Sequence, residues 1–97
     1  MQNFQNKSID RLFETISALN TPEDCRAFFE DLCTIKEIQD MAQRLDTAVL
    51  LSKGYSYQQI AGQVKISTAT ICRVNRALNY GCDGYKKAIE IIEGTEK

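Results

Sequence analysis

The chain has 97 residues, of which 43% are hydrophobic and 26% charged, and its net charge at pH 7 is −1. This globular composition leaves room for one domain, residues 1–97, and a domain this small rarely encloses an enzymatic cleft, so we expect no catalytic residues. The start, MQNFQNKSID, lacks a signal-peptide pattern, and no apolar run approaches the ~20 residues of a membrane span, so we expect a cytoplasmic protein with no membrane partner.

Apolar residues at helical spacing predict an all-α fold of about six short helices. Ser8 is the expected cap of the first helix, and Thr21 followed by Pro22 predicts the start of the second. The first helix carries an apolar stripe at helical spacing, formed by Ile9, Leu12, Phe13, Ile16 and Leu19. The residues of the second helix that are expected to face inward are Cys25, Phe28, Phe29 and Leu32.

The longest predicted helix begins at a capping box formed by Thr34 and Glu37 and runs to about Lys53. Its apolar positions cover much of its circumference and are Ile35, Ile38, Met41, Ala42, Leu45, Ala48, Val49, Leu50 and Leu51. A helix of this kind needs cover from two sides, which one small domain does not readily supply. We therefore expect a homodimer.

Residues 56–78 have the pattern of a helix-turn-helix. Gly54 ends the long helix, and Ser56 caps the next. The expected inward positions are Ile60, Ala61, Val64, Ile66, Ile71 and Val74. Ala61 is expected at the crossing of the two helices, where a larger side chain would not fit.

The outward positions of this motif are small, hydroxylated or basic, as a helix lying in the major groove of DNA requires. Residues 53–87 carry a net charge of +5, whereas the flanking segments are acidic. This distribution favours contact with the phosphates of double-stranded DNA. The candidate DNA-binding residues are Gln58, Lys65, Ser67, Thr68, Ala69, Thr70, Arg73 and Arg76.

The second helix of the motif is expected to end near Leu78, broken by the residues Asn79, Tyr80 and Gly81 and by Gly84. A last helix follows, with Tyr85, Ala88, Ile89 and Ile92 on its inner side.

Four cysteines and the absence of histidine exclude the usual mixed zinc sites. We expect no metal and no cofactor. The thiols of Cys25, Cys33, Cys72 and Cys82 are expected to be reduced and to act as small apolar core groups.

The stretch ATICRVNRAL, residues 69–78, resembles the recognition helix of the tryptophan repressor superfamily, and the similarity extends from about Leu32 to Ile92. Thr34, Arg44 and Gly54 resemble the segment that precedes the motif in that superfamily. The resemblance implies an intertwined homodimer and an effector pocket between the long helix and the recognition helix. In the tryptophan repressor, the pocket residues align with Thr34, Arg44 and Arg73, which suit a carboxylate.

The chain departs from this superfamily at two pocket positions. Val74 replaces a glycine that leaves room for the indole ring, and Ala77 replaces a serine that helps to hold the amino group. We therefore expect the effector, if one binds, to be a small amino-acid-like or carboxylate molecule other than tryptophan.

These features predict a dimeric, sequence-specific DNA-binding transcription regulator that acts as a repressor. Two alternatives stay open. One is a small helical dimeric enzyme of the chorismate mutase sort, built around Arg11, Glu37 and Arg44. The other is a helical protein-binding module in which the helix-turn-helix is only a packing unit.

Overall fold

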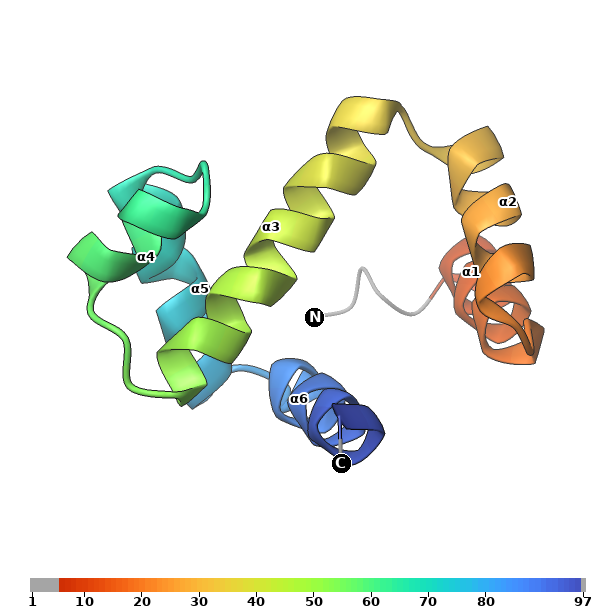
Figure 1. Ribbon diagram of the computed structural model, residues 1–97. Coiled ribbons are helices and arrows are strands. Elements are labelled where there is room, and N and C mark those ends of the chain that lie inside the picture. The colour runs from red at the N-terminus through yellow and green to blue at the C-terminus, as the bar shows by residue number, and fades with distance from the viewer. Residues whose placement is uncertain (1–5, 97) are drawn as a thin grey trace. The chain divides into compact units, whose positions relative to one another are not determined.

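The computed structural model describes residues 6–96, which contain six helices and no strand (Figure 1). The helices are α1 (Lys7–Ala18), α2 (Pro22–Leu32), α3 (Ile35–Ser52), α4 (Tyr57–Gln63), α5 (Thr68–Tyr80) and α6 (Gly84–Glu96). The prediction of an all-α fold with about six helices is confirmed. The segment MQNFQNKSID, in which we expect no signal peptide, is described only from residue 6 onward, because residues 1–5 lie outside the described part of the chain.

The chain divides into two compact units, Met1–Ile38 and Gln39–Lys97, with the boundary inside α3. The first unit holds α1, α2 and the first turn of α3. The second holds the rest of α3 with α4, α5 and α6, and in it α5 contacts both α4 and α6. The expectation of a single domain over residues 1–97 stays a prediction.

Side chains that cap the helices determine where most of them begin. Thr21 Oγ1 accepts the Asp24 N–H at 3.0 Å. At the start of α3, the Glu37 N–H donates to Thr34 Oγ1 at 3.1 Å and the Thr34 N–H donates to Glu37 Oε1 at 2.8 Å. Ser56 and the side chain of the third helical residue, Gln59, form the same reciprocal pair before α4. These three predicted starts are confirmed.

The predicted cap of the first helix is wrong. Asn6 is the cap, because its Oδ1 accepts the Ile9 N–H at 2.8 Å, and Ser8 lies within the first turn of α1. Asparagine is at least as good an N-cap as serine, and its position allows the helix to begin two residues earlier than a cap at Ser8 would.

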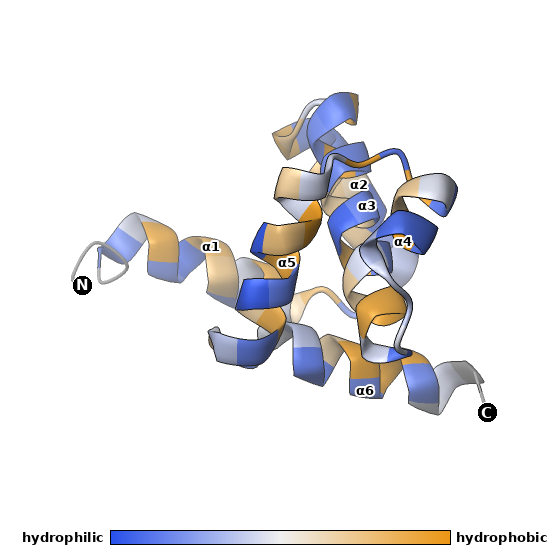
Figure 2. Ribbon diagram, turned by 90° about the vertical axis from the view of Figure 1, so that its left-hand side faces the viewer, coloured by the Kyte–Doolittle hydropathy of each residue, from blue (hydrophilic) through white to orange (hydrophobic). Residues whose placement is uncertain are grey.

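The core of the second unit lies where α3, α5 and α6 meet. Its buried members are Ala48, Val74, Leu78 and Ile89, and the partly buried Val49, Leu51 and Tyr85 pack against it. Hydrophobic and hydrophilic residues alternate along the ribbons of these helices, as expected for amphipathic helices (Figure 2). The spacing of apolar residues did not reveal Thr47, which is fully buried and donates its hydroxyl to the Gln43 carbonyl at 2.8 Å.

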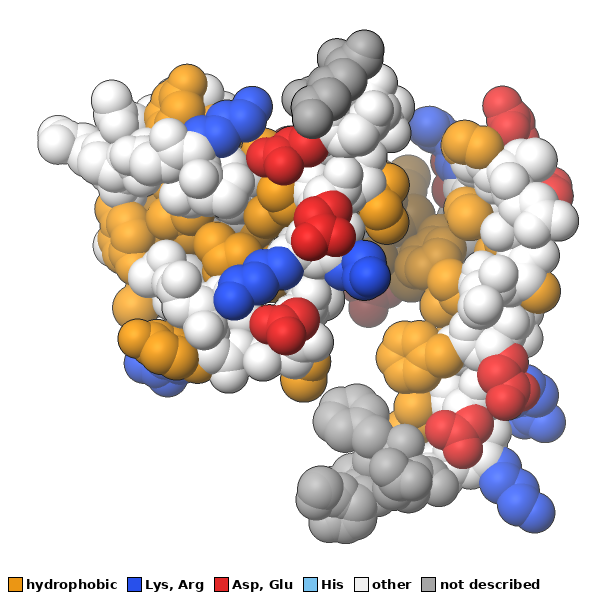
Figure 3. Space-filling model, turned by 90° about the horizontal axis from the view of Figure 1, so that it is seen from below, with side chains coloured by type: hydrophobic (Ala, Val, Ile, Leu, Met, Phe, Trp, Pro, Cys, Tyr) orange, Lys and Arg blue, Asp and Glu red, His pale blue; other side chains and the backbone are white. Residues whose placement is uncertain are grey.

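Several large apolar side chains are uncovered in the single chain, and hydrophobic atoms reach the surface of both units (Figure 3). Phe13 is 57% exposed, Leu32 53% and Ile35 74%. The prediction that Leu32 faces inward is wrong for one chain, because helical spacing identifies an apolar face but not what covers it. Phe13 and Ile35 belong to predicted apolar stripes, and the stripe of the long helix is the one expected to need cover from a second chain. Tyr80 and Ile91 in the second unit are exposed as well.

Among residues 6–96, no helix combines the length and hydropathy needed to cross a membrane. The described residues also contain no cluster of cysteine, aspartate or glutamate side chains that could hold a metal ion.

Candidate nucleic-acid interface

The helix-turn-helix consists of α4, the turn at residues 64–67, and α5. Ile60 and Ile71 are completely buried, and Val64 and Ile66 are half-buried. These inward positions are confirmed. They hold the two helices in contact and leave the opposite side of α5 exposed to solvent.

The second helix is two residues longer than predicted and ends at Tyr80. Asn79 does not break it, because its side-chain amide donates to the Asn75 carbonyl at 2.9 Å, within the same helix. Gly81 follows as the C-cap, at a position where any β-carbon would overlap the Ala77 carbonyl oxygen.

Ala61 does not occupy the crossing of the two helices, so that prediction is wrong. It is exposed, whereas its neighbour Ile60 is fully buried. Successive residues of a helix are rotated by about 100°, and in α4, which has only seven residues, Ile60 alone faces the interior fully.

All eight candidate DNA-binding residues lie on the helix-turn-helix. Seven are exposed and Thr70 is half-buried; the exposed ones are Gln58, Lys65, Ser67, Thr68, Ala69, Arg73 and Arg76. On α5 the inward positions are Ile71, Val74 and Leu78, so outward and inward residues do not overlap. The exposed side of α5 is therefore free to approach a ligand without disturbing the core.

Positive charge gathers at this motif. Lys65, Arg73 and Arg76 are exposed on it, and Lys53 is exposed just before it. The remaining two basic residues of the segment, Lys86 and Lys87, lie on α6. Lys86 is 3.7 Å from the carboxylate of Asp83, and since both side chains are largely exposed this pair is weak. The charge that favours phosphate binding thus comes mainly from the helix-turn-helix itself.

The first turn of α5 is capped by Ser67, whose Oγ accepts the Thr70 N–H at 3.1 Å. The hydroxyl groups of Ser67 and Thr70 also bond to each other at 2.9 Å. The first backbone N–H groups of a helix carry partial positive charge, so this end of α5 is suited to an approaching phosphate.

Cys72 is a further member of the exposed face of α5, and the motif pattern did not identify it. Cys72 is exposed and lies three residues after Ala69 and four before Arg76, so the three residues share one side of the helix. This spacing could have identified it. The expectation that the cysteines are core groups is wrong, because Cys82 is exposed as well and Cys25 and Cys33 are only half-buried.

The three candidate effector-binding residues do not all lie in one unit. Thr34 is exposed in the first unit, while the half-buried Arg44 and the exposed Arg73 belong to the second. Val74 is only 1% exposed and packs with Ala48, Leu78 and Ile89. The tryptophan repressor has a glycine at the position of Val74. In this chain, the side chain of Val74 fills that space as part of the core.

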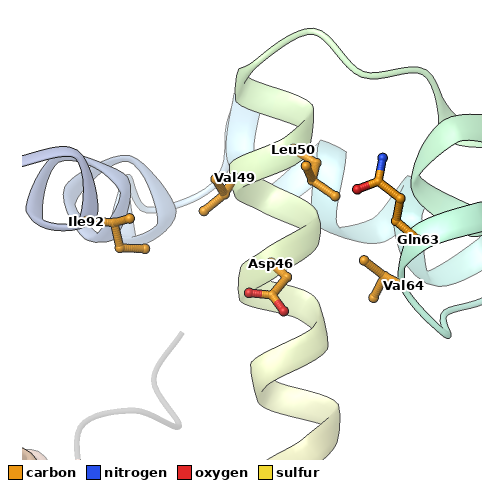
Figure 4. A pocket seen from close by; sticks show the side chains of 6 residues that line it. All are labelled: Asp46, Val49, Leu50, Gln63, Val64 and Ile92. Atoms are coloured by element: carbon orange, nitrogen blue, oxygen red, sulfur yellow. The ribbon is translucent and has the colours of Figure 1, made fainter. Parts of the chain in front are cut away.

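Three open hollows on the second unit have volumes of about 330, 500 and 550 Å³. Arg44 and Arg73 line none of them. The smallest is lined by Asp46, Val49, Leu50, Gln63, Val64 and Ile92, and Val64 points from the end of α4 toward α3 (Figure 4). A single carboxylate and a single amide on an apolar floor do not form a convincing carboxylate-binding site.

Residues 7–93 match the family of the Trp repressor protein. YerC, an uncharacterized protein of Bacillus subtilis (strain 168), is 48% identical over 92 residues, which are 95% of this chain and 88% of YerC. The crystal structure of a TrpR-like protein from Eubacterium eligens ATCC 27750 is 40% identical, with a TM-score of 0.91 and 96% of each chain covered. A second solved structure, from Staphylococcus aureus, is also 40% identical, with a TM-score of 0.89 over 96% of this chain and 95% of the other. The chain therefore belongs to the Trp repressor family.

Proposed function

We propose that this protein is a dimeric, sequence-specific DNA-binding transcription regulator that acts as a repressor. The observation that carries the proposal is the exposed, basic outer face of α5 on a well-packed helix-turn-helix. Thr68, Ala69 and Thr70 meet base edges, and Gln58, Lys65, Arg73 and Arg76 hold phosphates. In a symmetric dimer, two α5 helices about 34–36 Å apart enter successive major grooves on one side of the duplex.

The salt dependence of DNA binding tests this proposal. Arg76→Ala is expected to weaken binding to every duplex and to reduce the slope of log K against log salt by about 0.9, since one phosphate contact is lost. Arg26→Ala is the matched control, because this exposed arginine lies on α2, away from the helix-turn-helix in sequence, and pairs with Glu30 on the same helix. Absence of salt-sensitive DNA binding by the parent protein would refute the proposal in favour of a protein-binding module.

The proposed dimer is supported by the apolar side chains that one chain leaves uncovered, notably Phe13, Leu32 and Ile35. Large exposed apolar residues that gather on helix faces are typical of surfaces that bind another protein. Their positions on α1, α2 and α3 agree with the intertwined dimer that the family resemblance implies.

We expect light scattering to show a dimer at micromolar concentration, and Phe13→Asp to shift it toward monomer. Ser17→Asp introduces the same charge at an exposed polar position of α1 and should leave the dimer intact. A stable, folded parent monomer at micromolar concentration would contradict the dimer.

We also propose that any effector is a small carboxylate held by Arg44 and Arg73, and that it is not tryptophan. A carboxylate effector is supported by the guanidinium groups of the two arginines, whose geometry matches a carboxylate. The exclusion of tryptophan is supported by the buried side chain of Val74.

An enzyme of the chorismate mutase sort is the weaker alternative. One of its candidate groups, Glu37, is already engaged, since its carboxylate accepts the Thr34 N–H in the cap of α3. The Trp repressor family is regulatory rather than enzymatic, and no structural observation favours catalysis over DNA binding.

A further inference from the structure

The cap of α5 differs from the reciprocal caps of α3 and α4. In those, a long side chain, Glu37 or Gln59, reaches back to the backbone N–H of the capping residue. Thr70 holds the same third position of α5, but it bonds the side-chain hydroxyl of Ser67 at 2.9 Å. This departure occurs on the helix that is proposed to read DNA.

The two hydroxyl groups have two protons, and the bond between them uses one. If Ser67 donates that proton, the proton of Thr70 is left for an acceptor on DNA, such as purine N7, guanine O6 or thymine O4. If Thr70 donates it, Thr70 presents only lone pairs and can accept from adenine N6 or cytosine N4. The proton of Ser67 is then left for a phosphate. Reversing one hydrogen bond therefore changes the role of Thr70 without moving either side chain.

We infer that Ser67 is a specificity-determining residue, which sets whether Thr70 donates to or accepts from a base edge in the major groove. This inference rests on the proposed DNA-binding function. Ser67 already accepts the Thr70 N–H at 3.1 Å, so both partners are held in place before DNA arrives. The two hydroxyl groups thus act together on one base, and Ser67 determines whether Thr70 is the donor or the acceptor.

Ser67→Asn tests the inference while preserving the cap, since asparagine and serine are about equally good N-caps. The Oδ1 of asparagine has no proton, so it can only accept from the Thr70 hydroxyl. Thr70 is then left with lone pairs alone. We expect selection from random duplexes to show, at one base pair of each half-site, a shift of about tenfold in relative affinity toward adenine or cytosine.

Three further variants make the result specific. Thr70→Val, which removes the hydroxyl at nearly constant shape, should abolish the preference at that base pair. Ser67→Asn added to Thr70→Val should change base preference no further. Ser56→Asn, the same exchange at the cap of α4, should leave base preference as in the parent, and circular dichroism should show all four variants folded.

The outcomes separate this inference from the function on which it rests. If the parent binds DNA and Thr70→Val alters base preference but Ser67→Asn does not, the inference is wrong and the proposed function stands. The inference is also wrong if Ser67→Asn changes base preference equally in the parent and in the Thr70→Val variant. Ser67 would then affect base preference independently of the Thr70 hydroxyl. If the parent binds no DNA, the proposed function fails and the inference fails with it.

Discussion

Replacing Ile71 with alanine is expected to lower the free energy of unfolding by about 2–5 kcal/mol. Ile71 is completely buried in α5, and so is Ile60 in α4, the helix that packs against it. Removal of three side-chain carbons leaves a cavity that a seven-residue helix held by so few buried groups cannot close easily. Because a domain of this kind has only about 5–15 kcal/mol of stability, the loss is a large share of the total.

Urea unfolding, followed by circular dichroism at one fixed protein concentration, measures this change. Cys72→Ala is the matched control, because Cys72 is the next residue of the same helix and is exposed. It should shift the free energy of unfolding by less than about 0.5 kcal/mol. Equal stability of Ile71→Ala and the parent would show that α4 and α5 are not held together by this buried contact.

No useful tryptophan binding is expected in calorimetry, and the reason lies at Val74. Its side chain is buried against Ala48, Leu78 and Ile89, where the tryptophan repressor has a glycine. Forcing an indole ring against a filled core position costs about 1–3 kcal/mol. Ala77 removes a hydrogen-bond partner of the ligand's ammonium group, and leaving such a group buried and unpaired costs about 1–3 kcal/mol more.

The double variant Val74→Gly with Ala77→Ser should recover part of the tryptophan affinity, provided that the rest of the pocket is intact. Ala77→Ser alone is the control, since it restores the hydroxyl without making room for the ring. DNA binding by the parent should be constitutive or should respond to a smaller acid held by Arg44 and Arg73. Micromolar binding of tryptophan that tightens DNA binding by the parent would contradict this expectation.

Helix starts could be predicted from the sequence because they depend on contacts three residues apart. The caps at Thr21, Thr34 and Ser56 follow from such local pairs and are confirmed. The prediction of Ser8 instead of Asn6 as the first cap is wrong because these two good capping residues lie two positions apart, and local preference hardly distinguishes them.

Burial was harder to predict because it depends on what lies opposite each helix face. The period of 3.6 residues identifies Ile71 and Val74 as inward residues, which is confirmed, but it also places Ala61 and Leu32 inward, and both are exposed. Helical spacing gives the direction of a side chain and not the presence of a neighbour. The cysteines were assigned to the core for a similar reason, from the average behaviour of the residue type.

The location of the candidate site could be predicted from the sequence, whereas its hydrogen bonding could not. The motif pattern and the positive charge placed all eight candidate residues on the helix-turn-helix. The bond between the hydroxyls of Ser67 and Thr70 depends on the rotamers of both side chains, which a sequence pattern does not specify. The roles of these residues in binding DNA remain predictions.

The inward and outward positions of α5 have a consequence for evolution. Ile71, Val74 and Leu78 maintain the fold, whereas Thr68, Ala69 and Cys72 are exposed and contribute little to it. Natural selection can therefore act on the second set of positions almost independently of the first. Under the proposed function, one copy left by a gene duplication can acquire a new DNA target through a few substitutions on the exposed side of α5 while it keeps the inherited scaffold. Proteins built on this helix can therefore diverge in their exposed residues while the intermediate sequences keep their fold.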